Sequence, residues 1–172
     1  MNKRTLIFAA AIVLQLAILA GIPAKKVYTR ATGREVALKV VPIDPYDILK
    51  GYYVTLGYEI SRPSALLDGT KLEPGAVIYA VVEKQEDGLW TPVALEQELP
   101  QDLPNDRVAL RGKWNGFRFD YGIEQFSIPE SKRDVIANDL NKNLNEARVD
   151  VKVDANGNAA LLRLKIQDRV YE

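Results

Sequence analysis

The chain has 172 residues, 47% of them hydrophobic and 27% charged, which is the composition of a globular protein with one domain and an additional segment. Basic and acidic residues number 23 each, so there is no bulk positive field for nucleic acid or anionic lipid. Histidine and cysteine are absent, which excludes Ser-His-Asp triads, cysteine nucleophiles, disulfides and zinc sites built from those ligands.

The first 26 residues predict a transmembrane anchor. An apolar run extends from Leu6 to Ile22, with Gln15 as its one polar interruption and basic residues on both sides. As a helix this run would be about 25 Å long, near the lower limit for crossing a bilayer, whereas the apolar part of a secretory signal is usually shorter. We therefore favour an uncleaved single-pass anchor. The alternative is a signal peptide cleaved after Ala24, although Ile22 is larger than the residue preferred near such a site.

The place of this anchor in the chain suggests its orientation. Positive charge flanks both ends, so the positive-inside rule discriminates poorly, but a short N-terminus before a long domain is typical of an N-in signal anchor. We expect residues 1–26 to lie in the cytoplasmic (inner) membrane, residues 27–34 to form a polar tether, and residues 35–172 to form an extracytoplasmic domain.

The domain is expected to be rich in short strands. Alternating or β-prone segments predict strands at 35–41, 53–60, 77–84, 90–96, 107–114, 117–123, 149–153 and 159–166. Asp87-Gly88 and Asn115-Gly116 predict tight hairpin turns between consecutive strands. The three aromatic residues of the 117–123 segment are expected to share one face.

One helix is predicted within the domain. Ser131 and Asp134 stand at capping-box spacing, and Ile136, Leu140 and Leu144 form an apolar stripe along the helix that follows. The expected fold class is therefore α+β, a mainly antiparallel β domain with one amphipathic helix, preceded by an N-terminal transmembrane helix. We expect a curled sheet with the helix closing its open face.

Residues 42–50 predict a capped helical turn. Asp44 suits the N-cap, Pro45 suits the first helical position, and Asp47 can face the exposed amides of the first turn. Lys50 falls in the last turn, where positive charge is favoured, and Gly51 can take the left-handed conformation that ends a helix. Capping accounts fully for both acids, so a structural role is favoured over a catalytic one.

A tyrosine-rich strand is expected after this turn. Its alternate residues are expected to be buried on one face, and these are Val54, Leu56, Tyr58 and Ile60. Tyr52 precedes the strand and is expected at the rim of the domain, beside Asp47 and Lys50, as part of a partner-binding patch. The alternative is that the Tyr52 ring packs over the turn.

The segment Gly51-Tyr52-Tyr53-Val54-Thr55-Leu56-Gly57-Tyr58 is similar to the motif Gly-Asp-Tyr-x-x-Leu-x-Tyr. The matching positions are Gly51, Tyr53, Leu56 and Tyr58, and Tyr52 stands where the motif has aspartate. Residues 121–130 resemble a second block of the same family, with Tyr121, Gly122 and Glu124 as its candidate motif residues. On these motifs the chain resembles the GDYXXLXY-motif family of bacterial membrane-anchored proteins, whose activity is not established.

Two functions from different classes are compatible with these features. One is an accessory or binding domain that supports a multi-pass membrane protein; the resemblance implies this because relatives resemble companions of such proteins, and an anchor raises the local concentration of a membrane partner. The other is a membrane-surface hydrolase, which would use the carboxylates Asp44 and Asp47 or a Ser–Lys pair of Ser127 or Ser131 with Lys50. A purely structural envelope protein is the third alternative.

No cofactor, metal ion or nucleic acid is expected as a partner. The sequence contains no Gly-rich phosphate loop of the Walker or dinucleotide type. Asp154-x-Asn156-x-Asn158 has the oxygen spacing that opens a calcium loop, but its glycine is in the fourth place rather than the sixth. A hairpin turn is therefore the favoured interpretation of this segment.

Overall fold

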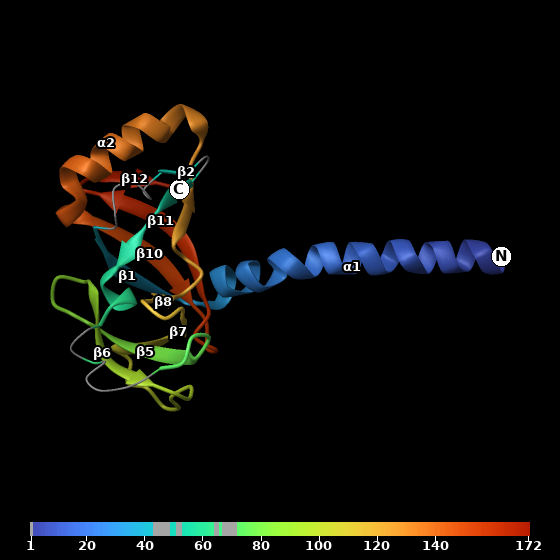
Figure 1. Cartoon of the computed structure of the whole chain (residues 1–172), viewed down its shortest axis with the longest axis horizontal. Coiled ribbons are helices and arrows are strands. Elements are labelled where there is room, and N and C mark those ends of the chain that lie inside the picture. Colours follow the sequence, from blue (N-terminus) through green and yellow to red (C-terminus); the bar gives the residue numbers. More distant parts are fainter. Residues whose placement is uncertain (1, 43–48, 51–52, 64–65, 67–71) are drawn as a thin grey trace.

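The computed structural model describes residues 2–42, 49–50, 53–63, 66 and 72–172. Within them the protein is an α+β structure, a β-rich domain from which one long helix, α1 (Lys3–Thr32), projects (Figure 1). All strand pairs formed by the described residues are antiparallel. The α+β class with mainly antiparallel sheets is therefore confirmed.

The first sheet joins the beginning and the end of the domain. Its order is β12–β11–β10–β1–β4, with β1 (Arg34–Val41), β4 (Gly57–Tyr58), β10 (Ala147–Val153), β11 (Ala159–Ile166) and β12 (Arg169–Tyr171). Paired residues of β1 and β10 alternate into the core, as Val36 does opposite Val151 and Leu38 opposite Val149. Burial of one face thus sets the register of this pair.

Two smaller sheets complete the domain. One has the order β2–β3–β9, with β2 (Leu49–Lys50), β3 (Tyr53–Thr55) and β9 (Gln125–Ser127). The other has the order β6–β5–β7–β8, with β5 (Val77–Lys84), β6 (Trp90–Glu96), β7 (Arg107–Trp114) and β8 (Phe119–Asp120). Buried residues of all three sheets form one core. The single curled sheet that was expected is therefore wrong.

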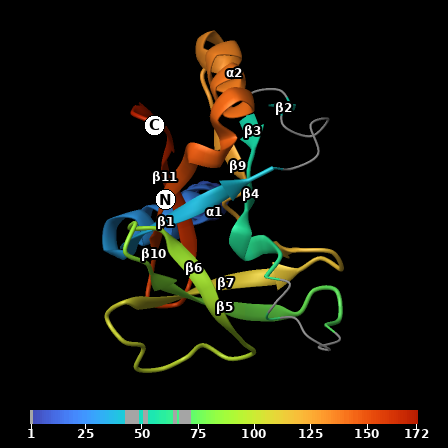
Figure 2. The same cartoon turned by 90° about the vertical axis from the view of Figure 1, so that its left-hand side faces the viewer.

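The helix of the domain lies at one end of this arrangement. Figure 2 shows α2 (Arg133–Asn143) at the end of the domain opposite β5, β6 and β7. Ile136 and Leu140 are buried, as expected, whereas Leu144 is only partly buried and begins a separate 3-10 turn, Leu144–Glu146. The capping box is wrong, because a 3-10 turn at Glu130–Lys132 precedes α2 and the residue at its N-cap is Lys132, which makes no side-chain cap bond.

The bounds of several strands agree with those predicted from the sequence. β5, β6, β7 and β11 have the predicted bounds. The hairpin turns at Asp87-Gly88 and Asn115-Gly116 are present, with φ of +82° at Gly88 and +96° at Gly116. Asn115 also accepts hydrogen bonds from the amides of residues 117 and 118 through its side-chain oxygen, which reinforces the second turn.

Two predicted strands are shorter or interrupted. In the 117–123 segment, Phe119 and Tyr121 are buried but Phe117 is 67% exposed, with the Arg62 guanidinium 3.9 Å from its ring centroid. The 53–60 segment divides at Leu56, because β3 pairs with β9 while β4 pairs with β1, and a 3-10 turn, Glu59–Ser61, follows. The chain therefore passes from one sheet to another within the predicted strand.

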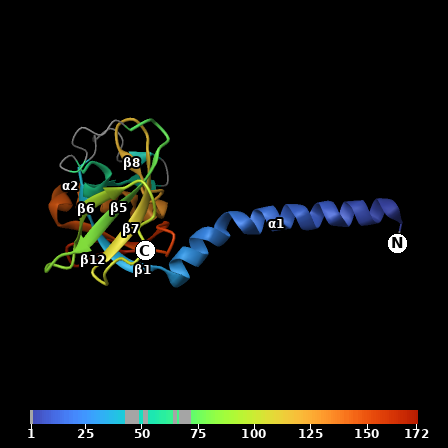
Figure 3. The same ribbon diagram turned by 90° about the horizontal axis from the view of Figure 1, so that it is seen from below.

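Helix α1 continues where a tether was expected. It includes Pro23 and remains helical to Thr32, and β1 begins two residues later at Arg34. The parts Lys3–Leu19 and Pro23–Thr32 are inclined by 44°, and Figure 3 shows the bend close to the domain. Among the described residues no single helix is long and apolar enough to cross a bilayer, but these two parts together meet that criterion. Residues 27–32 of the expected polar tether are therefore helical, and Arg34 already belongs to β1.

Candidate functional site

The predicted site residues fall into two groups. Asp44, Pro45, Asp47, Gly51 and Tyr52 lie outside the described residues, so the cap at Asp44 and the Tyr52 patch stay predictions. The others lie on β2, β3 and β4, at Leu56 between β3 and β4, and on the segment that connects β8 to β9. The place of Lys50 in the last turn of a helix is wrong, because its backbone belongs to strand β2. The backbone of β2 places Lys50 opposite Tyr53, and β3 in turn places Tyr53 opposite Ser127.

The motif segment and the second block pack against each other. Val54 pairs with Phe126 across β3 and β9, and both side chains are buried. Leu56 is 1% exposed, and its amide donates a hydrogen bond to the carbonyl oxygen of Glu124 at 2.7 Å. The two sequence blocks are therefore partners in one structural unit.

Two buried tyrosines complete this unit. The Tyr58 hydroxyl donates to the carbonyl oxygen of Ile123 at 2.5 Å, and the Tyr121 hydroxyl donates to the carbonyl oxygen of Ile60 at 2.8 Å. The predicted burial of Tyr58 is confirmed, at 1% exposure. Burial, with a smaller contribution from the charge of Glu124, raises the pKa of both phenols well above the ordinary value. Both hydroxyls therefore remain protonated hydrogen-bond donors.

The turn between β8 and β9 holds the second block in shape. Glu124 Oε1 accepts a hydrogen bond from the Tyr121 amide at 2.5 Å, which closes the turn. Gly122 has φ of +75°, a conformation that favours glycine. Glu124 thus has a structural partner, and the arrangement of Tyr58, Tyr121 and Glu124 supports the fold and presents no activated nucleophile.

A second polar cluster joins α1 to the domain, and the sequence patterns did not reveal it. The hydroxyl of Thr29, which is 1% exposed, donates to Asp154 Oδ2 at 2.7 Å. Arg30 donates to the carbonyl oxygen of Leu161 from Nε at 2.9 Å and from Nη2 at 2.6 Å. A Cβ at Gly33 would lie 2.5 Å from the Thr29 carbonyl oxygen and 2.9 Å from backbone atoms of Val153, so only glycine allows this close approach.

The carboxylate of Asp154 accepts several hydrogen bonds from nearby groups of the chain. Its Oδ1 accepts hydrogen bonds from the amides of Asn156 at 2.9 Å and Asn158 at 3.0 Å. Burial alone would raise the pKa of this carboxyl, but the bonds from Thr29, Asn158 and the backbone lower it below its ordinary range. The segment 154–158 is a hairpin turn between β10 and β11, as favoured from the sequence. Within the described residues no cluster of three or more acidic side chains has the geometry to hold a metal ion.

Comparison with known proteins places the chain in a family. Neither the curated proteins nor the solved structures contain a match to it. A family profile, described as GDYXXLXY protein, matches residues 15–164. This match includes the motif at 51–58, the second block at 121–130, and the end of α1 that is joined to the domain. The chain therefore belongs to the GDYXXLXY protein family.

Proposed function

We propose that α1 anchors this protein in the cytoplasmic membrane and that its domain lies on the extracytoplasmic side, where it binds and supports a multi-pass membrane protein. The observation that carries this proposal is the surface of α1. Apolar side chains are exposed on consecutive positions, among them Phe8 at 68%, Val13 at 65% and Leu14 at 63%. Since consecutive positions point in different directions around a helix, the part of α1 before Pro23 exposes apolar side chains in several directions and favours an apolar environment.

The junction between α1 and the domain supports a function in which the domain has a fixed orientation relative to α1. Thr29 and Arg30 bond to the β10–β11 hairpin, and Gly33 places the end of α1 against the backbone of Val153. A domain joined in this way keeps a fixed direction relative to its helix, whereas a flexible tether would let it rotate. A fixed domain near the bilayer presents the same face to neighbours in that membrane, at high local concentration.

The family motif also favours a binding domain. Leu56, Tyr58 and Tyr121 hold the domain together through burial and hydrogen bonds to backbone carbonyls. They supply no group with the pKa of a general base or nucleophile at neutral pH. Binding of a partner is therefore assigned to the surface around the motif, including Tyr52, which the sequence places at the rim.

Membrane integration can be tested on the native chain. After an alkaline carbonate wash the protein should remain in the membrane pellet at its full-length mass, because α1 is retained and inserted. A soluble product beginning at Lys25 would show that the apolar segment is a cleaved signal and would overturn the anchor.

The absence of cysteine permits a clean test of orientation. Asn2→Cys and Glu86→Cys each introduce one thiol at an exposed position, one before α1 and one in the β5–β6 turn. A membrane-impermeant maleimide should label Glu86→Cys in intact spheroplasts, and it should label Asn2→Cys only after the membrane is opened. The reverse pattern would place the domain in the cytoplasm.

One observation favours the alternative hydrolase enough to test it. Lys50 and Ser127 both lie opposite Tyr53, so their backbones share a register position about 10 Å apart, with one strand between them. A serine-reactive fluorophosphonate tests this arrangement. Labelling that Ser127→Ala abolishes and Ser131→Ala retains would support the Ser–Lys pair; no labelling of the native protein would exclude an activated serine.

A further inference from the structure

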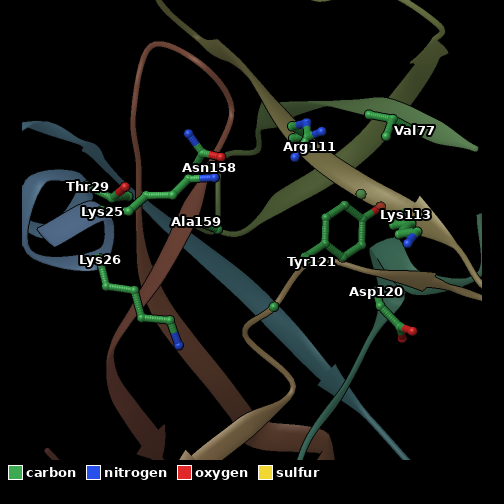
Figure 4. A pocket seen from close by; sticks show the side chains of 12 residues that line it. Lys25, Lys26, Thr29, Val77, Arg111, Lys113, Asp120, Tyr121, Asn158 and Ala159 are labelled. Atoms are coloured by element: carbon green, nitrogen blue, oxygen red, sulfur yellow. The ribbon is translucent and has the colours of Figure 1, made fainter. Parts of the chain in front are cut away.

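A cavity of about 290 Å³ lies at the base of α1, between the helix on one side and β7 with the segment between β8 and β9 on the other (Figure 4). Its volume is near the lower end for small-ligand sites. Four basic side chains line it, Lys25 and Lys26 from α1 and Arg111 and Lys113 from β7. Figure 4 shows the two pairs on opposite sides, with the ring of Tyr121 beside Lys113.

The basic side chains of this cavity outnumber its acidic ones by four to one. Asp120 is the one acidic residue of the lining, and its carboxylate accepts hydrogen bonds from Asn115 at 2.8 Å and from Arg118 at 3.0 Å. In the part of the chain that the structure describes, no carboxylate forms an ion pair with any of the four basic side chains. The chain as a whole is neutral, so this cavity is a local concentration of positive charge.

The donors of the other polar side chains in the wall are already bonded. The Tyr121 hydroxyl donates to Ile60 and the Thr29 hydroxyl donates to Asp154, so Tyr121 offers its ring and the helix offers its lysines. Gly112 allows the Tyr121 ring to pack against β7, since a Cβ there would lie 2.8 Å from Cε1 of Tyr121. Ammonium and guanidinium groups are thus what the cavity offers a ligand, and both prefer phosphate or carboxylate oxygens.

We propose that this cavity binds the phosphate group of an anionic lipid headgroup. The assignment to a lipid rests on the proposed anchoring of α1: Lys25 and Lys26 directly follow the apolar run, so in an inserted protein the cavity opens at the level of the headgroups. Ammonium and guanidinium groups attract a phosphodiester headgroup through charge and hydrogen bonding. A soluble phosphate has the same chemistry, and the experiment below separates the two sources.

Binding can be measured by calorimetry on the full-length protein in a neutral detergent. The probes are short-chain phosphatidylglycerol, phosphatidylcholine with the same chains, and inorganic phosphate. Phosphatidylglycerol should bind saturably and phosphatidylcholine should not. The double variant Lys26→Glu, Lys113→Glu should weaken this binding by about tenfold or more, because two attractive charges become repulsive. Inorganic phosphate should compete weakly for the same site.

Lys84→Glu is the matched control. It makes at one exposed position, at the far end of β5, the substitution that the double variant makes at each of its two positions, and it lies about 23 Å along the strand from Val77, which lines the cavity. Lys84→Glu should leave the affinity for phosphatidylglycerol unchanged. A loss of affinity as large as that of the double variant would mean that the lipid responds to the net charge of the protein, and it would overturn the site. If the double charge reversal lowers the melting temperature, the milder double variant Lys26→Gln, Lys113→Gln is measured instead. Unchanged affinity of that variant for phosphatidylglycerol would also overturn the site.

The outcomes also separate this site from the anchor itself. Inorganic phosphate that binds as tightly as phosphatidylglycerol would overturn the lipid assignment. Protein that resists carbonate extraction but binds no phosphatidylglycerol would overturn the cavity alone and leave the anchor in place. Protein that carbonate releases would overturn the anchor, and with it the lipid as the native ligand.

Discussion

Tyr58 and Tyr121 hold each other's segments in place through reciprocal hydrogen bonds. Tyr58 donates to Ile123, two residues after Tyr121, and Tyr121 donates to Ile60, two residues after Tyr58. Both rings are buried in the common core. The motif at 51–58 and the block at 121–130 therefore contain both partners of one interaction, which gives a physical reason for their occurrence together in this chain.

Removal of the Tyr58 hydroxyl should destabilise the domain. Tyr58→Phe leaves the buried Ile123 carbonyl without its side-chain donor, so the free energy of unfolding should fall by about 1–3 kcal/mol. Urea denaturation of the full-length protein in detergent measures this change. Tyr79→Phe is the control, because Tyr79 is only partly buried and its hydroxyl has no partner among the described residues. Equal effects of the two substitutions would contradict the role given to Tyr58.

The close approach at Gly33 should tolerate no side chain. Gly33→Ala brings a methyl group within 2.9 Å of the Val153 backbone, and the resulting overpacking should cost about 1–3 kcal/mol. We also expect faster proteolysis within residues 27–34, since the end of α1 would no longer pack against β10 and β11. Thermal unfolding and limited proteolysis provide the measurements. Ala31→Ser, at an exposed position two residues earlier, should behave like the native protein in both.

Acid should weaken the first sheet through Asp150. Burial alone would raise the pKa of this carboxyl, but hydrogen bonds and charge from Lys165 and Arg163, each 2.6 Å away, lower it below the ordinary range. Because the folded-state pKa is lower than the unfolded value of about 3.9, the contribution is complete above that pH and is lost as the pH falls through the folded-state pKa. Stability should therefore decline below about pH 4.

Asp150→Asn isolates this contribution. The variant should be less stable at neutral pH by about 1–3 kcal/mol, because Arg163 and Lys165 lose a charged acceptor, and its stability should depend less on pH below about pH 4. Asp168→Asn, at an exposed position with no ion pair among the described residues, should keep the native pH profile. A variant profile that is parallel to the native one would assign the acid sensitivity to other carboxylates, such as Asp154.

Local chemistry explains which parts of the fold the sequence predicted well. Gly88 and Gly116 adopt positive φ in hairpin turns, and a hairpin turn fixes the ends of its two flanking strands within a few residues. The bounds of β5, β6 and β7 were therefore predictable. Burial of Tyr58 was predictable for a similar reason, since alternation along a strand is also a local pattern.

Contacts between distant residues explain most of the differences. Thr29 and Asp154 are 125 positions apart in the sequence. The sequence of the 27–34 segment alone does not indicate that Thr29 will donate to a buried carboxylate or that α1 will remain helical to Thr32. The division of the 53–60 segment depends on β9 and β1, which pair with successive parts of it. The cavity at the base of α1 is also lined by residues of α1 and β7 that are far apart in the sequence. The sequence showed Lys25 and Lys26 only as a basic pair after the apolar run.

The two tyrosines at either end of the motif should have opposite roles. Tyr58 is buried and bonded, so Tyr58→Ala should lower the melting temperature strongly through the loss of a large core side chain, at a cost of about 3–5 kcal/mol. Tyr52 stands where the family motif has aspartate, and its place before the strand in the sequence predicts a position at the rim of the domain. Tyrosine combines a large apolar face with one polar group and is frequent in binding surfaces.

We therefore predict that Tyr52→Ala weakens co-purification of a membrane partner while thermal unfolding stays close to that of the native protein. The measurement compares crosslinked complexes isolated from membranes with melting curves of the same purified variants. Tyr58→Ala should lower the melting temperature first, and any loss of partner should follow from unfolding. If Tyr52→Ala instead lowers the melting temperature and retains the partner, its ring packs over the turn, and the partner surface lies elsewhere on the domain.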